Sequence, residues 1–113
     1  VHANEKEVAD RGKRPYMNEG IVSKHGANQE YCTDGVSAAV FKDLCREAGV
    51  PFQTFTNRSD MLGGSTLGNI SNTKVALNAV DIGLPQLAMH SPYETAGVKD
   101  TYYLIQAAEK FFK

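Results

Sequence analysis

The sequence predicts an α/β fold, in which helices pack against a β-sheet. Segments rich in β-branched and aromatic residues occur at 21–25 and 51–56, each bounded by turn-forming residues. Between them, and again near the carboxyl end, apolar residues recur with helical spacing. Such alternation of strand and helix signals is typical of the α/β class. The 113 residues have the length of one domain and contain no internal repeat or low-complexity segment.

The clearest helical signal lies between these two strand-like segments. Apolar residues recur there at every fourth position, at Val36, Val40, Leu44 and Ala48. Phe41 and Cys45 lie beside them and complete one apolar helical face. Asp34 is placed to cap the amino end of this helix. Gly49 and Pro51 then end it, since glycine suits a left-handed cap and proline cannot continue a helix.

Weaker signals mark the remaining elements. Residues 2–20 mix charges of both signs and read as a solvated loop. We expect short strands at Ile21–His25, Gln29–Thr33, Pro51–Thr56 and Ala79–Gly83. A glycine-rich turn at 63–65 leads into a helix that ends near Leu77. Asp100 or Thr101 can cap a last helix with the apolar stripe Leu104, Ile105, Ala108, Phe111 and Phe112, and with Lys110 and Lys113 at its carboxyl end.

Composition excludes several classes of partner. The net charge of −1 and the pI near 6.3 give no electrostatic reason to expect nucleic acid or an anionic membrane surface. No apolar run approaches the roughly 18 residues of a membrane span. Cys32 and Cys45 are too few for a secreted disulfide framework, so we expect reduced, buried thiols and a cytoplasmic protein.

One histidine stands out as a candidate ligand. His90 ends the nearly apolar run "LPQLAMH" just before a Ser-Pro turn, where a strand end could present it to a metal. On the residues alone, a hydrogen-bonded packing role is the more usual one for a lone histidine at a strand end. His25 reads as a surface residue, and neither a His-Glu-x-x-His motif nor paired cysteines are present.

Other polar residues also admit two interpretations. The turn "GGSTLG" offers backbone N–H groups for an anion or a carbonyl oxygen, or is simply a tight turn. It lacks the Lys-Ser/Thr ending of a phosphate-binding loop. Lys24 and Arg58 are either solvated or able to hold a substrate carboxylate. Tyr31 reads as a packing residue of a half-buried strand.

Several motifs together resemble a known family. The segments "NRSDMLGGSTLGNIS", "VDIGLPQLAMHSPYETAG" and "KDTYYLI…FF" are similar to the carboxyl-terminal part of the aspartyl aminopeptidase family of cocatalytic zinc aminopeptidases. "KHGANQEYCTDG" resembles that family's Lys-(x)-Asn-x-x-Gln-x-Tyr segment. "VHANEKE…KRPY" resembles the tail of its Asp-x-x-His-Ala-Val-His-Pro-Asn motif and the loop to Arg-Pro. The resemblance extends over essentially the whole chain and is closest to bacterial members.

The resemblance implies a role for specific residues. His90 corresponds to the last histidine ligand of two zinc ions, whose other ligands and general base fall before Val1. Lys24 corresponds to a lysine that pairs with the substrate's side-chain carboxylate, and Tyr31 to a tyrosine near the reacting carbonyl. Gly64, Ser65 and Thr66 correspond to a loop lining the substrate pocket, so the predicted substrate-binding set is Lys24, Tyr31, Gly64, Ser65 and Thr66.

The resemblance also implies that this chain is one part of a larger enzyme. Residues 1–113 would form the carboxyl-terminal portion of a three-layer zinc-peptidase catalytic domain, without the family's amino-terminal part and inserted oligomerisation domain. The whole protein would be a homo-oligomeric, cytoplasmic aminopeptidase acting on peptides that begin with Asp or Glu. Ala3, Gly26 and Gly63 depart from the family pattern and leave that preference open. Alone, the chain should be inactive, bind zinc weakly and self-associate through exposed apolar surface. A self-standing ligand-binding module, or a degenerate paralogue kept for assembly, are the alternatives.

Overall fold

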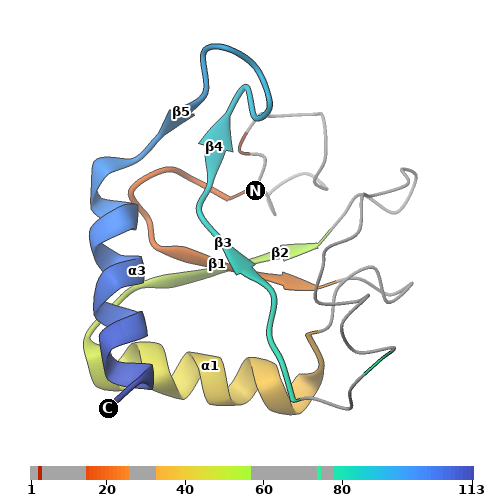
Figure 1. Cartoon of the computed structure of the whole chain (residues 1–113), viewed down its shortest axis with the longest axis vertical. Helices are drawn as coiled ribbons and strands as arrows, with labels where there is room; N and C mark the ends of the chain where they lie inside the picture. Colours follow the sequence, from red (N-terminus) through yellow and green to blue (C-terminus); the bar gives the residue numbers. More distant parts are fainter. Residues whose placement is uncertain (1–2, 4–14, 26–32, 57–73, 75–77) are drawn as a thin grey trace.

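A computed structural model describes residues 3, 15–25, 33–56, 74 and 78–113. Figure 1 shows a small central sheet with helices beside it and a separate hairpin at one end of the molecule. The α/β class predicted from the sequence is confirmed. The strand expected at Gln29–Thr33 and the helix expected between Gly63 and Leu77 lie almost wholly outside the described residues.

The central sheet contains three strands in the order β2-β1-β3. β1 (Ile21–His25) pairs in parallel with β2 (Phe52–Thr56) and antiparallel with β3 (Ile82–Gly83). All three predicted strands therefore form, although β2 and β3 are shorter than expected. β1 is the middle strand, and Val22 and Ser23 are both fully buried. Since neighbouring residues of a strand face opposite sides, β1 is covered on both faces.

The first helix, α1 (Gly35–Ala48), connects the two parallel strands. Its amino end is a reciprocal cap, because Ser37 N donates to Asp34 Oδ1 at 2.7 Å and Asp34 N donates to Ser37 Oγ at 3.0 Å. Gly49 ends the helix with a φ of 71°, in the left-handed region that favours glycine. Both predicted ends are confirmed.

The predicted apolar face of α1 is partly wrong. Phe41 and Cys45 are buried, but Val36 and Val40 are 73% and 63% exposed. A helix advances about 100° per residue, so positions taken every four residues drift by about 40° at each step. The early valines therefore lie off the buried side, which Ser37 and Ala38 occupy instead.

The last helix, α3 (Val98–Phe111), lies beside α1 (Figure 1). Its cap residue is Gly97 and no side chain caps it, so the expected cap at Asp100 or Thr101 is wrong. Asp100 lies inside the first turn, where its carboxylate accepts bonds from a distant loop. Lys110 lies in the last turn, as expected.

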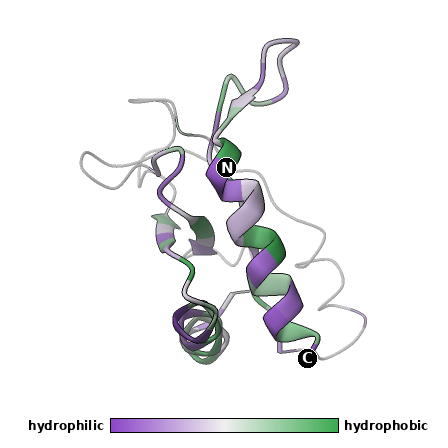
Figure 2. Cartoon of the chain, turned by 90° about the vertical axis from the view of Figure 1, so that its left-hand side faces the viewer, coloured by the Kyte–Doolittle hydropathy of each residue, from purple (hydrophilic) through white to green (hydrophobic). Residues whose placement is uncertain are grey.

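Much of the predicted stripe on α3 stays accessible. Ala107 is buried and Leu104 is half-buried, whereas Ile105, Phe111 and Phe112 are 51%, 66% and 82% exposed. Figure 2 shows that hydrophobic and hydrophilic residues alternate along the ribbon of this helix. Within the described part of the chain, the small sheet and α1 thus leave several apolar side chains at the end of α3 uncovered.

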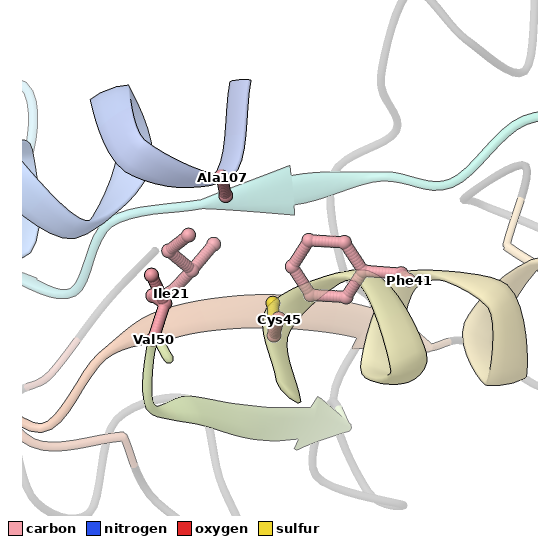
Figure 3. Packing of buried hydrophobic residues seen from close by; sticks show 5 residues of the cluster. All are labelled: Ile21, Phe41, Cys45, Val50 and Ala107. Carbon is pink, nitrogen blue, oxygen red and sulfur yellow. The ribbon is translucent and has the colours of Figure 1, made fainter. Parts of the chain in front are cut away.

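The core lies where α1, α3 and β1 meet. Its buried members, shown in Figure 3, are Ile21, Phe41, Cys45, Val50 and Ala107. Cys45 is a free thiol, as the sequence predicted, while Cys32 lies outside the described residues. Beside this core a cavity of about 230 Å³ has an almost wholly apolar lining, which includes Leu104 from α3 and Ile82 from β3.

Candidate functional site

His90 lies in the loop of a short hairpin. β4 (Gln86–Leu87) pairs antiparallel with β5 (Thr95–Ala96), and the intervening residues form turns. Figure 1 places this hairpin apart from the central sheet, at the top of the molecule. The histidine is therefore presented by a projecting loop rather than by the end of a sheet strand.

The backbone of this loop is held in an unusual conformation. His90 has a φ of 71° and Ala88 a φ of 52°, both in the left-handed region that non-glycine residues rarely adopt. Each such residue costs on the order of 1–3 kcal/mol and persists only where its surroundings enforce it. Here His90 N donates to Glu94 Oε1 at 2.5 Å and Ser91 N donates to Ala88 O at 3.1 Å. Strain of this kind concentrates at functional sites.

The imidazole of His90 is suited to serve as a ligand. Its side chain is exposed, and no side chain in the described residues hydrogen-bonds to the ring. A neutral imidazole nitrogen is a common zinc ligand. The described residues contain no group of three or more His, Cys, Asp or Glu able to hold a metal. The geometry of the described residues thus leaves His90 available as a single imidazole donor.

The beginning of the chain lies against the strand that leads to this loop. Ala3 N donates to Gln86 O in β4 at 2.7 Å, and Ala3 is 5% exposed. Ala3 belongs to the segment that resembles the tail of the family's Asp-x-x-His-Ala-Val-His-Pro-Asn motif. Two motif segments at opposite ends of the sequence are thus hydrogen-bonded to each other.

Lys24 occupies a different part of the fold. It is half-buried near the carboxyl end of β1, opposite Phe55 of β2, and its N–H donates to Asp81 O at 2.8 Å. β1 belongs to the central sheet and His90 to the separate hairpin (Figure 1). Tyr31, Gly64, Ser65 and Thr66 lie outside the described residues.

His25 is less exposed than the sequence suggested. Its ring is half-buried, and its Nε2 lies 3.2 Å from Ser23 Oγ. Burial lowers the pKa of His25 below its ordinary value, and the nearby positive charge of Lys42 lowers this pKa further. His25 is therefore a packed, uncharged residue near neutral pH rather than a solvated one.

The sequence did not reveal the role of Asp100. Its carboxylate is fully buried and accepts N–H bonds from Asn18 and Gly20, which lie 82 and 80 residues away. An acid in the first turn of a helix is commonplace, since it complements the helix dipole. Only burial distinguishes this carboxylate, and burial could not be read from the sequence.

Comparison with known proteins decides the family. The family described as aminopeptidase I zinc metalloprotease (M18) matches residues 1–112. The chain belongs to this family. The match confirms the resemblance seen in the sequence motifs. No helix formed by the described residues is both long and apolar enough to cross a membrane.

Curated relatives show the same family over the whole chain. The probable M18 family aminopeptidase 2 of Clostridium acetobutylicum is 49% identical over 112 residues, which cover 99% of this chain and 26% of that protein. The protein of the same description from Pseudomonas aeruginosa is 42% identical with the same coverage. The chain thus spans about a quarter of the length of the curated relatives it matches.

Solved structures agree with the fold. Ape4, in a cryo-EM structure of its complex with Nbr1, is 35% identical with a TM-score of 0.89, covering 92% of this chain and 20% of that chain. Yeast aminopeptidase 1 in its crystal structure is 27% identical with a TM-score of 0.77, covering 92% and 22%. The predicted zinc-peptidase-type fold is confirmed by these neighbours.

Proposed function

We propose that residues 1–113 are the carboxyl-terminal portion of the catalytic domain of a zinc aminopeptidase, which hydrolyses the amino-terminal residue from peptides. The family match over residues 1–112 supports this function. The observation that carries it is the bond from Ala3 N to Gln86 O, because it joins two family motifs beside the His90 loop. The family's amino-terminal part and inserted oligomerisation domain would lie outside these residues.

His90 would hold one of two zinc ions through its imidazole. Bound zinc supplies a Lewis acid that polarises the scissile carbonyl and lowers the pKa of water. The exposed ring and the backbone enforced by Glu94 support this role, because they fix a donor whose ring nitrogens have no side-chain partner among the described residues. A single imidazole cannot retain a catalytic ion, so the 113-residue chain alone would bind zinc weakly and be inactive.

The other predicted residues would handle the substrate. Lys24 would pair with the side-chain carboxylate of an amino-terminal Asp or Glu, and the fixed strand β1 would limit its movement. Tyr31 would donate to the oxygen that gains charge as the peptide carbonyl reacts. Gly64, Ser65 and Thr66 would line the pocket. Each of these roles rests on the motif correspondence.

The whole protein would be a homo-oligomer in the cytoplasm. A solved structure of mApe1 of S. cerevesiae, 27% identical over 92% of this chain, is described as a dodecamer. Exposed Ile105, Phe111 and Phe112 offer apolar surface that further chain or another subunit could cover. The free, buried thiol of Cys45 supports a reducing compartment.

Peptide hydrolysis by the whole zinc-loaded protein tests this function. Peptides beginning with Asp, Glu or a neutral residue are compared for the wild type, for Lys24→Met and for the exposed control Lys110→Met. Hydrogen bonds to charged groups contribute about 1.5–3 kcal/mol, so Lys24→Met should lower kcat/KM for acidic peptides by about ten- to a hundredfold more than for neutral ones. The control should leave both unchanged.

Two outcomes would contradict the proposal at different levels. Equal losses on acidic and neutral peptides would remove Lys24 from side-chain recognition. Failure of the wild-type protein to release any amino-terminal residue would reject the peptidase function itself and favour a binding or assembly role.

A further inference from the structure

Asp100 is a buried carboxylate with an unusual set of partners. The side chain is fully buried in the first turn of α3. Its Oδ2 accepts from Asn18 N at 2.7 Å and its Oδ1 accepts from Gly20 N at 3.0 Å. Removing a carboxylate from water is costly unless hydrogen bonds compensate, and here both oxygens are used. The contact therefore holds this helix end firmly against the loop before β1.

Asn18 completes the contact from the other side. Its Oδ1 accepts from Lys99 N at 3.0 Å, so the loop and the helix end exchange hydrogen bonds in both directions. Gly97 allows this close approach, because a Cβ there would lie 2.4 Å from Asn18 Oδ1 and 2.7 Å from Asp100 Oδ2. We name these residues the α3 junction: Asn18, Gly20, Gly97, Lys99 and Asp100.

The α3 junction joins the supports of two candidate site residues. Gly20 directly precedes β1, the strand that carries Lys24. Gly97 directly follows β5, one of the two strands that hold the His90 loop. In Figure 1 β5 runs straight into α3, and β1 and β5 belong to different sheets. The junction thus connects, by hydrogen bonds, two parts of the fold that are not paired through any of the described strands.

We propose that Asp100 is a positioning residue, which fixes the His90 hairpin relative to strand β1 and so aligns the metal-binding and substrate-binding sides of the site. This inference rests on the proposed function of His90 and Lys24. It assigns to a residue of α3 a role in the geometry of a site that it does not itself touch.

Another side chain provides a control for simple loss of stability. Gln53 of β2 also holds the loop before β1, since its Nε2 donates to Tyr16 O at 2.8 Å and to Gly20 O at 3.1 Å. Its Oε1 accepts from Tyr16 N at 2.8 Å. Gln53→Met therefore loosens the same loop from the side of the sheet, and the hydrogen bonds that it removes go to Tyr16 and Gly20 rather than to the hairpin.

The test uses the whole protein with Asp100→Asn, in which one accepting oxygen becomes an NH2 group facing an N–H donor. A milder variant, Asn18→Gly, deletes the acceptor for Lys99 N and keeps the φ of 65° favourable. Asn18 is exposed, so this variant leaves the core intact if Asp100→Asn does not fold. Glu109→Gln removes an exposed charge from the same helix and serves as the second control.

Zinc affinity is measured by chelator competition, together with KM and kcat for peptide hydrolysis. Misplaced supports of metal ligands typically cost about ten- to a hundredfold in affinity, so Asp100→Asn should weaken zinc binding by about tenfold. Asn18→Gly should act in the same direction with a smaller change. Gln53→Met and Glu109→Gln should leave zinc affinity within about twofold of the wild type, even where Gln53→Met lowers stability as much as Asp100→Asn.

Equal zinc affinity for Asp100→Asn and Gln53→Met, at equal stability, would overturn the positioning role. The variant His90→Ala separates this failure from that of the proposed function. If His90→Ala weakens zinc binding but neither junction variant does, only the positioning role fails. If His90→Ala leaves zinc affinity unchanged, the proposed ligand itself is wrong.

Discussion

Gly20 directly precedes β1, where the loop enters the sheet. Its replacement by alanine tests how closely the backbone there approaches the start of the parallel strand β2. The residue has a φ of 115°, and a Cβ would lie 2.2 Å from Pro51 O and 2.9 Å from Phe52 N. Non-bonded heavy atoms normally approach to about 3.5 Å, so the strands must part by roughly 1 Å. That movement breaks the bond from Ile21 N to Pro51 O, now 3.2 Å.

The expected cost follows from these two effects. A non-glycine residue at positive φ costs about 1–2 kcal/mol, and a buried hydrogen bond left unmade costs about 1–3 kcal/mol. Gly20→Ala should therefore lower the free energy of unfolding by about 2–5 kcal/mol. This is a large share of the roughly 5–15 kcal/mol that stabilises a typical domain.

Two other glycines provide matched controls. Gly49 has a φ of 71° but no atom within 4 Å of a built Cβ, so Gly49→Ala should cost only about 1 kcal/mol. Gly35 begins α1 with no such contact and no positive φ, so Gly35→Ala should be neutral or stabilise by up to about 1 kcal/mol. Urea unfolding followed by far-ultraviolet circular dichroism measures all three. A Gly20→Ala variant as stable as Gly49→Ala would refute the close approach at Pro51.

Three further predictions concern reactivity, pH and association. Burial raises the pKa of Cys45 to about 11, so iodoacetamide should label the native protein at pH 8 far more slowly than the urea-unfolded protein; equal rates would contradict burial of the thiol. The pKa of His25 is lowered in the folded state, so the unfolded chain binds more protons than the folded one below about pH 6.5. The free energy of unfolding should therefore be greatest above about pH 6.5 and fall as the pH decreases below it. His25→Gln should make this decrease with pH less steep. Phe111 and Phe112 are 66% and 82% exposed, so the double change to Ser should lower self-association of the 113-residue chain in sedimentation, whereas an unchanged sedimentation profile would exclude this surface.

Local signals predicted the central elements well. The ends of α1 follow from Asp34 and Gly49, and the limits of β1 follow from composition and the neighbouring turn. These features depend on residues close in sequence. The exposure of Val36 and Val40 could not be predicted, because it depends on which side of the helix the sheet and α3 cover.

For the candidate site, too, some features could be predicted from the sequence and others only from the fold. Family motifs predicted His90 as a ligand, but the left-handed backbone there depends on Glu94 and on the pairing of β4 with β5. The bonds of Asp100 reach across some 80 residues, so no local pattern could indicate them. Resemblance thus predicted the identity of the candidate, and only the fold revealed what holds it.

The zinc content of the whole protein tests the central claim most directly. Wild-type protein, His90→Ala and the control His25→Ala are dialysed against a buffered zinc concentration, and bound zinc per chain is measured. We predict equal zinc content for wild type and His25→Ala, and the loss of at least one ion from His90→Ala, because an imidazole donor cannot be replaced by a methyl group. Retention of the full zinc content by His90→Ala would contradict the assignment of this histidine to a metal site.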